Sequence, residues 1–456
     1  MREELARGDA GSCLQGGAAA DRPRDAGDAA PGRPNAGPEA TGEGTPDAGG
    51  DTGAGPDAGA GPGGVLAVAD DAAPMREARG VWVTRWDYRS PDDVKAILAA
   101  VAAAGFNQVF FQVRGAGDAY YRSRLAPWAA SLGGKLGRDP GWDPLALACG
   151  EARRLGLELH AWINVCTGWK GAQPPGRSRP RHLLRAHPDW RVRDRRGRAQ
   201  PYADGAYIFV NPAQPAFQTH LEAIVAELVS FYAIDGLHLD YARYPAQDSS
   251  FDRTSQRLYR KARKREPGLD RAVWQRRVLA DFVGRLRERA LEARPDLRVS
   301  AAVTGIYLDR WGWGQVTQGL VDFHQDSHLW AEQGAVDTLV PMIYWPPAAQ
   351  PGQRCDFGTL VADFAPLGEK VGLQIGINAE AGDYAVLERE IAIVREHGLD
   401  GVVIFAWSAL YERGFLDLLG RGVFHRPAVP PGGEAITAPA PRTRAGSSRA
   451  SAARRG

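Results

Sequence analysis

Between residues 78 and 407 the chain repeats one pattern, in which a short run of β-branched and aromatic residues is followed by a loop, an amphipathic helix and the next short run. Short apolar runs bounded by turn residues predict strands, and apolar residues with a period of about 3.6 predict helices. Eight runs fit the strand pattern: Ala78–Trp86, Asn107–Arg114, Leu157–Val165, Gly236–Tyr241, Leu297–Thr304, Thr338–Trp345, Val371–Asn378 and Gly401–Trp407.

Signals at the helix ends support the segments between these runs. Ser90 precedes Pro91 and two aspartates, which is the order of an N-cap, a first helical residue and a negatively charged first turn. This helix is expected to end at Gly105. Further helices are expected at 144–155 and 213–232, and in a charged stretch that reaches Arg294.

Strands that alternate with helices form a parallel sheet, and eight such units close a (β/α)8 barrel. A doubly wound open sheet is the competing architecture. It would favour a glycine-rich phosphate-binding turn after the first strand, where this chain has Thr84-Arg85-Trp86-Asp87. The predicted fold class is therefore α/β, a (β/α)8 TIM barrel with long βα loops and disordered N- and C-terminal tails.

The composition changes at both ends of this block. Residues 1–64 contain 17 Gly, 14 Ala and 7 Pro and no Phe, Trp or Tyr, and residues 426–456 are rich in Pro, Ala, Ser and Arg. Such segments cannot bury enough apolar surface to offset chain entropy. They predict a disordered leader over 1–64, a barrel over 65–425 and a disordered basic tail over 426–456. A tether or a wall-anchoring segment is the functional alternative for the tails.

Charge and composition exclude several classes of protein. The net charge is +2 over 456 residues and the basic tail has no aromatic residues, so no nucleic-acid partner is expected. No run of about 18 apolar residues is present, so no transmembrane segment is expected, and the N-terminus lacks the apolar core of a secretory signal. Neither the cysteines nor the histidines have metal-site spacing, so neither a metal nor a cofactor is predicted. The oligomeric state and the location stay open.

Candidate chemistry follows from the fold, because the active site of such a barrel lies at the C-terminal ends of its strands. These ends are rich in aromatic, amide and charged side chains. The faces of sugar rings pack on aromatic rings, and sugar hydroxyls bind amide, carboxylate and guanidinium groups. The candidate substrate-binding residues are Gln112, Arg114, Trp162, Asn164, His238, Tyr241, Arg243, Tyr344, Trp345, Asn378 and Trp407. The alternative interpretation places the aromatic residues in the barrel core.

Asp240 is the first candidate for catalysis. It ends a strand of mostly apolar and small residues, where a carboxylate is costly unless it is used or paired. Its structural alternative is an ion pair with Arg243 or Arg114. Glycoside hydrolysis needs a second carboxylate. The candidates for that role are Glu380, just beyond the seventh strand, and its rivals Asp309 and Asp87.

Two other features bear on the site. Asp235 and Asp337 precede strands and are expected at the opposite, stabilising face of the barrel. The third loop, Cys166–Val210, carries many arginines, which is typical of a solvated face. The functional alternative is a rim that attracts an anionic polymer.

Several motifs together resemble the glycosyl-hydrolase-like family 10, over roughly residues 76–420. They are Arg79-Gly80-Val81-Trp82-Val83, His187-Pro188-Asp189-Trp190, Asn211-Pro212, Asp235-Gly236-Leu237-His238-Leu239-Asp240-Tyr241, Arg243-Tyr244-Pro245 and Pro341-Met342-Ile343-Tyr344-Trp345. The resemblance implies a barrel, a glycan substrate and a central carboxylate at Asp240. It also implies a cell-envelope polysaccharide, including peptide-free peptidoglycan, and an extracytoplasmic location. The stretch Phe323–Gln333 looks like an insertion that reshapes one side of the cleft.

Three hypotheses follow. The first is a glycoside hydrolase acting on a bacterial polysaccharide, with Asp240 as nucleophile or base and Glu380 as acid. The second is a catalytically inactive glycan-binding barrel. The third, an enzyme acting on a phosphorylated metabolite, would favour a glycine-rich phosphate loop after strands seven and eight, which the chain lacks.

Overall fold

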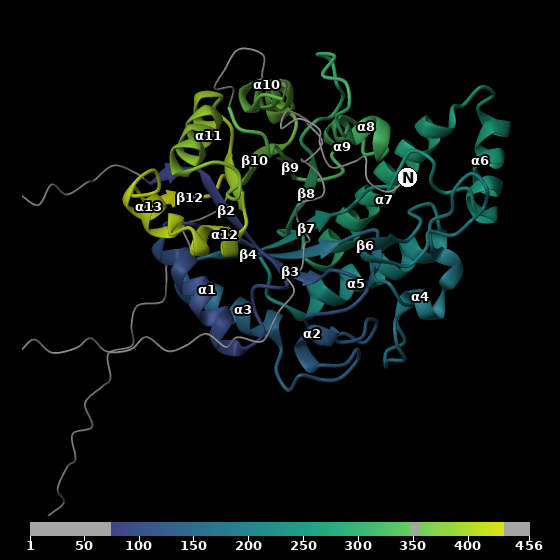
Figure 1. Cartoon of the computed structure of the whole chain (residues 1–456), viewed down its shortest axis with the longest axis horizontal. Helices are drawn as coiled ribbons and strands as arrows, with labels where there is room; N and C mark the ends of the chain where they lie inside the picture. Colours follow the sequence, from purple (N-terminus) through teal and green to yellow (C-terminus); the bar gives the residue numbers. More distant parts are fainter. Residues whose placement is uncertain (1–73, 348–354, 433–456) are drawn as a thin grey trace, which may run out of the picture. The chain divides into compact units, whose positions relative to one another are not determined.

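The computed structural model describes residues 74–347 and 355–432, and these residues form a closed barrel of parallel strands surrounded by helices (Figure 1). In order around the barrel the strands are β10 (Gly372–Asn378), β11 (Gly401–Phe405), β2 (Ala78–Val83), β3 (Gln108–Arg114), β4 (Glu158–Asn164), β7 (Gly236–Asp240), β8 (Arg298–Thr304) and β9 (Thr338–Met342). Each strand lies within one of the eight predicted runs. The predicted (β/α)8 barrel is therefore confirmed.

The helices follow the strands in the predicted alternation. The longer ones are α1 (Pro91–Ala103), α3 (Pro144–Leu155), α5 (Pro215–Phe231), α6 (Arg253–Arg265), α7 (Arg271–Ala293), α10 (Phe357–Phe364) and α11 (Tyr384–Glu396). The shorter ones are α2 (Ala130–Gly133), α4 (Leu183–Ala186), α8 (Gly319–Asp322), α9 (Ser327–Gln333), α12 (Trp407–Glu412) and α13 (Phe415–Arg421), with 3-10 turns at Pro188–Trp190 and Ala365–Glu369. Ser90 caps α1 as predicted, because its hydroxyl accepts from the backbone N–H of Asp93.

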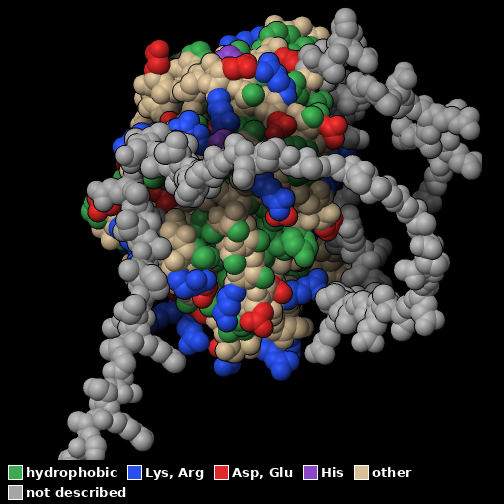
Figure 2. Space-filling model, turned by 90° about the vertical axis from the view of Figure 1, so that its left-hand side faces the viewer, with side chains coloured by type: hydrophobic (Ala, Val, Ile, Leu, Met, Phe, Trp, Pro, Cys, Tyr) green, Lys and Arg blue, Asp and Glu red, His purple; other side chains and the backbone are tan. Residues whose placement is uncertain are grey.

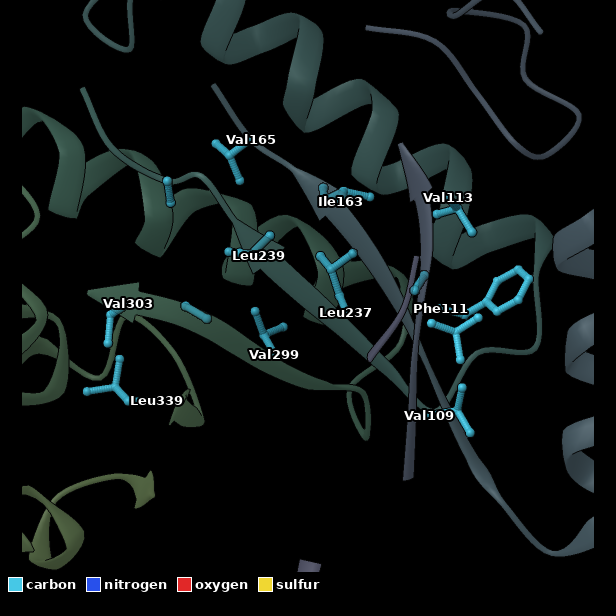
Figure 3. Close-up of a cluster of buried hydrophobic side chains, with 14 of the residues drawn as sticks. Val109, Phe111, Val113, Ile163, Val165, Leu237, Leu239, Val299, Val303 and Leu339 are labelled. Atoms are coloured by element: carbon cyan, nitrogen blue, oxygen red, sulfur yellow. The ribbon is translucent and has the colours of Figure 1, made fainter. Parts of the chain in front are cut away.

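A continuous apolar layer joins the outside of the barrel to the helices. Along β3, β4 and β7, alternate residues such as Phe111, Ile163 and Leu237 point outward into this layer (Figure 3). The residues between them point into the barrel. Asp240 has the parity of the inward set on β7, as the side-chain period of a strand requires.

Part of the barrel interior is filled by a separate buried cluster, which includes Trp82, Phe110, Trp162, Val340 and Val403. Beside this cluster, a cavity lined by residues that include Gln108, His160 and Gln374 lies towards the N-terminal rim. The active site of such a barrel lies at the C-terminal rim, so the chemistry of that rim decides what the protein can do.

The N-terminal rim has the stabilising role predicted for it. The carboxylate of Asp235 accepts from the backbone N–H of Leu159, and that of Asp337 accepts from Val299, each at 2.8 Å. These bonds tie the start of one strand to its neighbour.

The first and last segments that the structure describes meet at the same rim. Strands β1 (Met75–Arg76) and β12 (Ala428–Val429) pair in parallel, and buried Arg79 donates to the carbonyl oxygen of Arg426 at 2.7 Å. Residues 426–432 of the predicted tail are thus described and pack on the barrel. The predicted leader 1–64 and residues 433–456 lie outside the described residues.

The third loop has structure that the sequence did not indicate. Strands β5 (Thr167–Gly171) and β6 (Ala203–Phe209) pair antiparallel, and we call this pair the β5–β6 ribbon. Between them His187 stacks on Trp190 with ring centroids 4.0 Å apart. The buried amide of Asn211 donates to the carboxylate of Asp252, which also caps α6. These family-motif residues therefore hold the loop in place.

One face of the described part of the chain carries a mixture of side-chain types. Figure 2 shows Lys and Arg side chains interspersed with acidic and apolar ones on the face that carries α1 and α13. No helix within the described ranges is long and apolar enough to cross a membrane.

Candidate active site

Asp240 lies at the C-terminal end of β7, and its side chain is 8% exposed. One carboxylate oxygen accepts from the indole N–H of Trp162 at 3.1 Å, and the other accepts from the backbone N–H of Tyr241 at 2.6 Å. Donors of this kind stabilise a negative charge that burial would otherwise disfavour. The carboxylate is thus oriented by two donors from neighbouring segments.

The negative charges of Asp240 and Glu380 both affect the pKa of the Tyr344 phenol. Burial raises the pKa of Tyr344 well above its usual range, and negative charges on Asp240 and Glu380 act in the same direction. Glu380 itself is exposed, just beyond β10, where its backbone N–H donates to the Asn378 side chain at 3.0 Å. Asp240 ends β7 and Glu380 follows β10, three strands further around the barrel, so both carboxylates belong to the C-terminal rim.

Asp87 is the rival carboxylate with a perturbed titration. It follows β2, and counting around the barrel it lies three strands from β7 on one side, as Glu380 does on the other. Burial raises the pKa of Asp87 to about 6, against the opposing effect of hydrogen bonds from Thr84 and Ser408. A carboxyl that keeps its proton near pH 6 has the property required of a general acid.

Asp309 has a different role. Its carboxylate accepts from the backbone N–H groups of Trp311, Trp313 and Gly314, which folds the turn after β8. Although its partial burial acts to raise the pKa, these bonds leave the pKa of Asp309 below its ordinary value. The sequence placed it among the rivals for the second carboxylate, but in the structure its oxygens are engaged by this turn.

Four of the predicted sugar-binding residues lie beneath the mouth. Gln112 accepts from the Arg85 guanidinium at 2.9 Å and donates to Asn164 at 3.1 Å, while Arg114 donates to the Asn164 carbonyl. His238 is fully buried between the Trp82 indole N–H and the Ser300 hydroxyl, and burial lowers its pKa well below the usual value. Because these side chains are buried and bonded to protein, the structure gives them a supporting position. The residues concerned are Gln112, Arg114, Asn164 and His238.

The predicted aromatic platform divides into two groups. Trp162 is buried in the barrel interior, where it serves Asp240, and Trp345 belongs to the apolar layer outside the barrel. Tyr241, Tyr344 and Trp407 are partly exposed at the C-terminal rim. These three rings are therefore the ones positioned to meet a sugar.

Side chains that the prediction did not include complete the mouth. Trp86 is 47% exposed, and the guanidinium carbon of Arg85 lies 4.3 Å from the centre of its ring. Arg85 also donates to the hydroxyl of Tyr207, on β6, at 2.6 Å. The apolar run around Tyr207 was the only sequence signal for this ribbon, and the surrounding arginines and glycines obscured it.

The described residues at this site offer no arrangement of side chains that would bind a metal ion. Among the residues that the structure describes, no group of three or more His, Cys, Asp or Glu side chains is arranged to hold a metal ion. The expectation that no cofactor is needed stays a prediction.

Comparison with known proteins agrees with this geometry. Many glycoside hydrolases are barrels of this class, with carboxylates and exposed aromatic rings at the C-terminal rim. The chain belongs to the glycosyl hydrolase-like 10 family, whose model matches residues 77–385. The resemblance noted from the motifs is thereby confirmed.

Two curated relatives carry the name glycosyl hydrolase. DigH of Escherichia coli K12 is 30% identical over 261 residues, which cover 53% of this chain and 55% of DigH. YngK of Bacillus subtilis strain 168 is 27% identical over 293 residues, which cover 60% of this chain and 55% of YngK. The chain thus spans about half the length of these relatives.

Solved structures share the fold. The glycoside hydrolase domain of PgaB (BpsB) from Bordetella bronchiseptica aligns with a TM-score of 0.56 at 18% identity, covering 76% of this chain and 98% of that domain. The catalytic domain of β-amylase from Paenibacillus polymyxa aligns with a TM-score of 0.53 at 12% identity, covering 74% and 94%. At these identities the likeness concerns the barrel fold alone.

Proposed function

We propose that the protein is a glycosidase that hydrolyses a bacterial polysaccharide, with Asp240 as nucleophile or base and Glu380 as acid. The observation that carries the proposal is the position of Asp240, held by two donors at the C-terminal end of β7, with Glu380 on the same rim after β10. Two carboxylates flanking the bond to be cleaved are the requirement of this chemistry.

The roles follow from the surroundings of each carboxylate. Donors from Trp162 and Tyr241 stabilise the ionised form of Asp240, which suits attack on the anomeric carbon or activation of water. Glu380 lies at an exposed position, from which a proton can be exchanged with solvent. The partly exposed side chains of Tyr241, Tyr344 and Trp407 would seat the sugar.

Asp87 supports a variant of the same proposal. Its pKa of about 6 means that it holds a proton in mildly acidic conditions. In this variant Asp87 replaces Glu380 as the proton donor. Measuring turnover of Asp87→Asn and Glu380→Gln side by side decides between them, because only the variant that lacks the true acid loses activity on substrates with poor leaving groups.

The proposed substrate is a cell-envelope glycan such as peptide-free peptidoglycan, at an extracytoplasmic location. The family to which the chain belongs, and relatives named as glycosyl hydrolases, support a glycan substrate. A catalytically inactive glycan-binding barrel is the second candidate, favoured by the distance around the mouth that separates Asp240 from the other carboxylates.

The test compares full-length protein with Asp240→Asn and with Asp309→Asn as a matched control. Each is incubated with peptide-free peptidoglycan and a panel of bacterial glycans, and soluble products are identified by mass spectrometry. We expect products from the wild type and the control but not from Asp240→Asn. Binding without products from the wild type would establish the binding module. Equal products from all three proteins would remove Asp240 from the mechanism.

A further inference from the structure

One helix around the barrel carries basic side chains that have no acidic partner among the described residues. Helix α6 (Arg253–Arg265) packs beside α7, and Figure 1 shows it at the outer edge of the described structure. Seven of its 13 residues are Lys or Arg and none is Asp or Glu. All seven basic residues are exposed, and they are Arg253, Arg257, Arg260, Lys261, Arg263, Lys264 and Arg265.

The opposite side of α6 attaches the helix to the rest of the protein. Leu258 and Tyr259 pack with Trp274 of α7 in a small apolar cluster. The Tyr259 hydroxyl donates to the carbonyl oxygen of Leu269 at 2.8 Å, and the Asp252 carboxylate caps the first turn. Apolar contacts and these hydrogen bonds therefore hold α6 in place without an ion pair from its basic side chains.

Helical periodicity gathers most of the basic side chains on the outer side. Five of them lie at positions i, i+4, i+7, i+8 and i+11, which share one side of a helix. At a rise of about 1.5 Å per residue this stripe is about 17 Å long. We call it the basic face of α6, and it consists of Arg253, Arg257, Arg260, Lys261 and Lys264.

The neighbouring helix α7 shows a different arrangement. Several of its arginines pair with acidic residues, as Arg287 does with Asp337 at 2.6 Å. Glu266, which directly follows α6, is also used in this way, because it pairs with Arg277 of α7 at 2.6 Å. Within the part of the chain that the structure describes, no ion pair joins the basic face of α6 to an acidic side chain.

This concentration of charge is unfavourable for the helix itself. Like charges three or four positions apart destabilise a helix, and Arg253, Arg257 and Lys261 follow one another at intervals of four. Basic residues in the last turn interact favourably with the helix dipole, but Arg253 is the first helical residue, where the interaction is unfavourable. The stability of α6 therefore does not account for its basic face, whereas an anion lying against that face would relieve the repulsion.

The form of the basic face favours a planar anionic surface. Side chains on one side of a cylindrical helix can meet a flat array of phosphate groups together. Clusters of about four to eight Lys and Arg on an amphipathic helix bind anionic lipid headgroups. The one aromatic ring of α6, Tyr259, is on the packed side, so the basic face offers no ring for a nucleic-acid base to stack on. No large hydrophobic side chain of α6 is exposed, so the helix would lie on the headgroups without entering the bilayer.

We propose that the basic face of α6 docks the protein electrostatically on the anionic headgroup surface of a lipid bilayer. Docking of this kind is reversible and depends on salt, because it uses exposed charges and no apolar insertion. The proposal gives α6 a role separate from the barrel mouth, and it does not rest on the proposed function.

The test uses the full-length protein and two kinds of vesicle. One contains phosphatidylglycerol and phosphatidylcholine in equal parts, and the other contains phosphatidylcholine alone. Co-sedimentation gives the bound fraction as a function of lipid concentration. The α6 variant removes four charges from the basic face, through Arg253→Gln, Arg257→Gln, Arg260→Gln and Lys261→Gln. The control variant removes the same number of exposed charges elsewhere, through Arg89→Gln, Lys135→Gln, Arg138→Gln and Arg153→Gln.

We expect the wild type to bind the anionic vesicles and not the neutral ones. Each basic residue near such a surface strengthens binding about fivefold, so the α6 variant should bind at least about a hundredfold more weakly. The control variant should bind as the wild type does. Raising the salt concentration from about 0.1 M to about 1 M shortens the Debye length from about 10 Å to about 3 Å and should release the wild type.

Thermal unfolding shows whether the variants are folded. The Tm of the α6 variant should be no lower than that of the wild type, because repulsion between like charges is reduced. The comparisons of lipid and of salt use the wild type alone, so they test the proposal independently of any variant.

Other results would overturn the proposal. They are no binding of the wild type to the anionic vesicles, equal binding to both kinds of vesicle, binding that persists unchanged at high salt, and an equal loss of binding in the two variants. Tighter binding of duplex DNA or of soluble polyphosphate than of the anionic vesicles would also overturn it, because the basic face would then serve a soluble polyanion.

Discussion

The titration of Asp87 gives a prediction whose sign and size follow from the structure. Its carboxylate is largely buried at the end of β2, where one oxygen accepts from the backbone N–H of Thr84 at 2.6 Å. Burial raises its pKa from the ordinary 3.8 to about 6. Replacing the residue by Asn keeps an acceptor for this N–H and removes the ionisation.

The magnitude comes from linkage between proton binding and folding. Because the pKa of Asp87 is higher in the folded chain, its protonated form stabilises the fold fully below about pH 4, and this contribution is lost as the pH rises through about 6. One pKa unit corresponds to about 1.4 kcal/mol, so the loss is about 3 kcal/mol. The Asp87→Asn variant lacks this loss. Relative to the wild type it should therefore gain about 3 kcal/mol in free energy of unfolding between pH 4 and pH 8.

Urea unfolding of both proteins at several pH values between 4 and 8 measures this difference. Asp309→Asn is the control of opposite sign, because the pKa of Asp309 lies below its ordinary value. That carboxylate stabilises the fold at neutral pH and loses its contribution as the pH falls, so the control variant should be less stable than the wild type at pH 7 and approach it at low pH.

A difference between wild type and Asp87→Asn that does not change with pH would refute the reasoning. It would mean that water reaches the carboxylate freely and that Asp87 is ionised at pH 5, as an exposed aspartate is. In that case Asp87 could not serve as the proton donor, and Glu380 alone would remain for that role.

Three further predictions concern single side chains. Trp162→Phe removes a hydrogen bond to the Asp240 carboxylate worth about 1.5–3 kcal/mol and shortens a buried side chain, so the Tm should fall and kcat/KM on a cleaved glycan should fall about tenfold to a hundredfold; an unchanged rate would contradict this. Gly115→Ala would put a Cβ 2.5 Å from the Arg85 guanidinium. The variant should have an unfolding free energy lower by about 1–3 kcal/mol and should bind glycan more weakly. Unchanged stability and unchanged binding would show that the Arg85 side chain can shift without cost. Glu390→Met removes a buried carboxyl whose pKa burial raises to about 9, so the variant should be about 3 kcal/mol more stable than the wild type at pH 7, with a smaller gain at pH 4, as measured by urea unfolding.

The sequence was sufficient for the barrel because the information is local. Each β-branched run specifies a strand and each capped amphipathic segment a helix, and only one closed architecture accommodates eight such pairs. The same locality placed Asp240 on the inside of its strand and at its C-terminal end, since both follow from a period of two and a known boundary. Asp235 and Asp337 were assigned to the opposite rim by the same reasoning.

The sequence could not predict in this way how deeply each side chain is buried below the mouth of the barrel. Gln112, Asn164 and His238 have the parity and the polar character of ligand-binding residues, yet the structure buries them in hydrogen bonds with neighbouring strands. Trp345 lies one position beyond the inward-facing Tyr344 and is turned into the outer apolar layer. Strand periodicity gives the direction in which a side chain points, but it does not show which other segments of the chain cover that side chain.

The sequence by itself determined the fold class, the family and the first catalytic candidate, because strand periodicity, helix caps and motifs are properties of neighbouring residues. Only the tertiary structure decided which rim side chains are exposed, that burial gives Asp87 a pKa of about 6, and that the β5–β6 ribbon brings Lys170 against the rings of Tyr207 and Trp86. Burial and electrostatic environment depend on segments that meet in space after being separated by tens to hundreds of residues along the chain. Contacts of this kind cannot be predicted from the pattern of neighbouring residues.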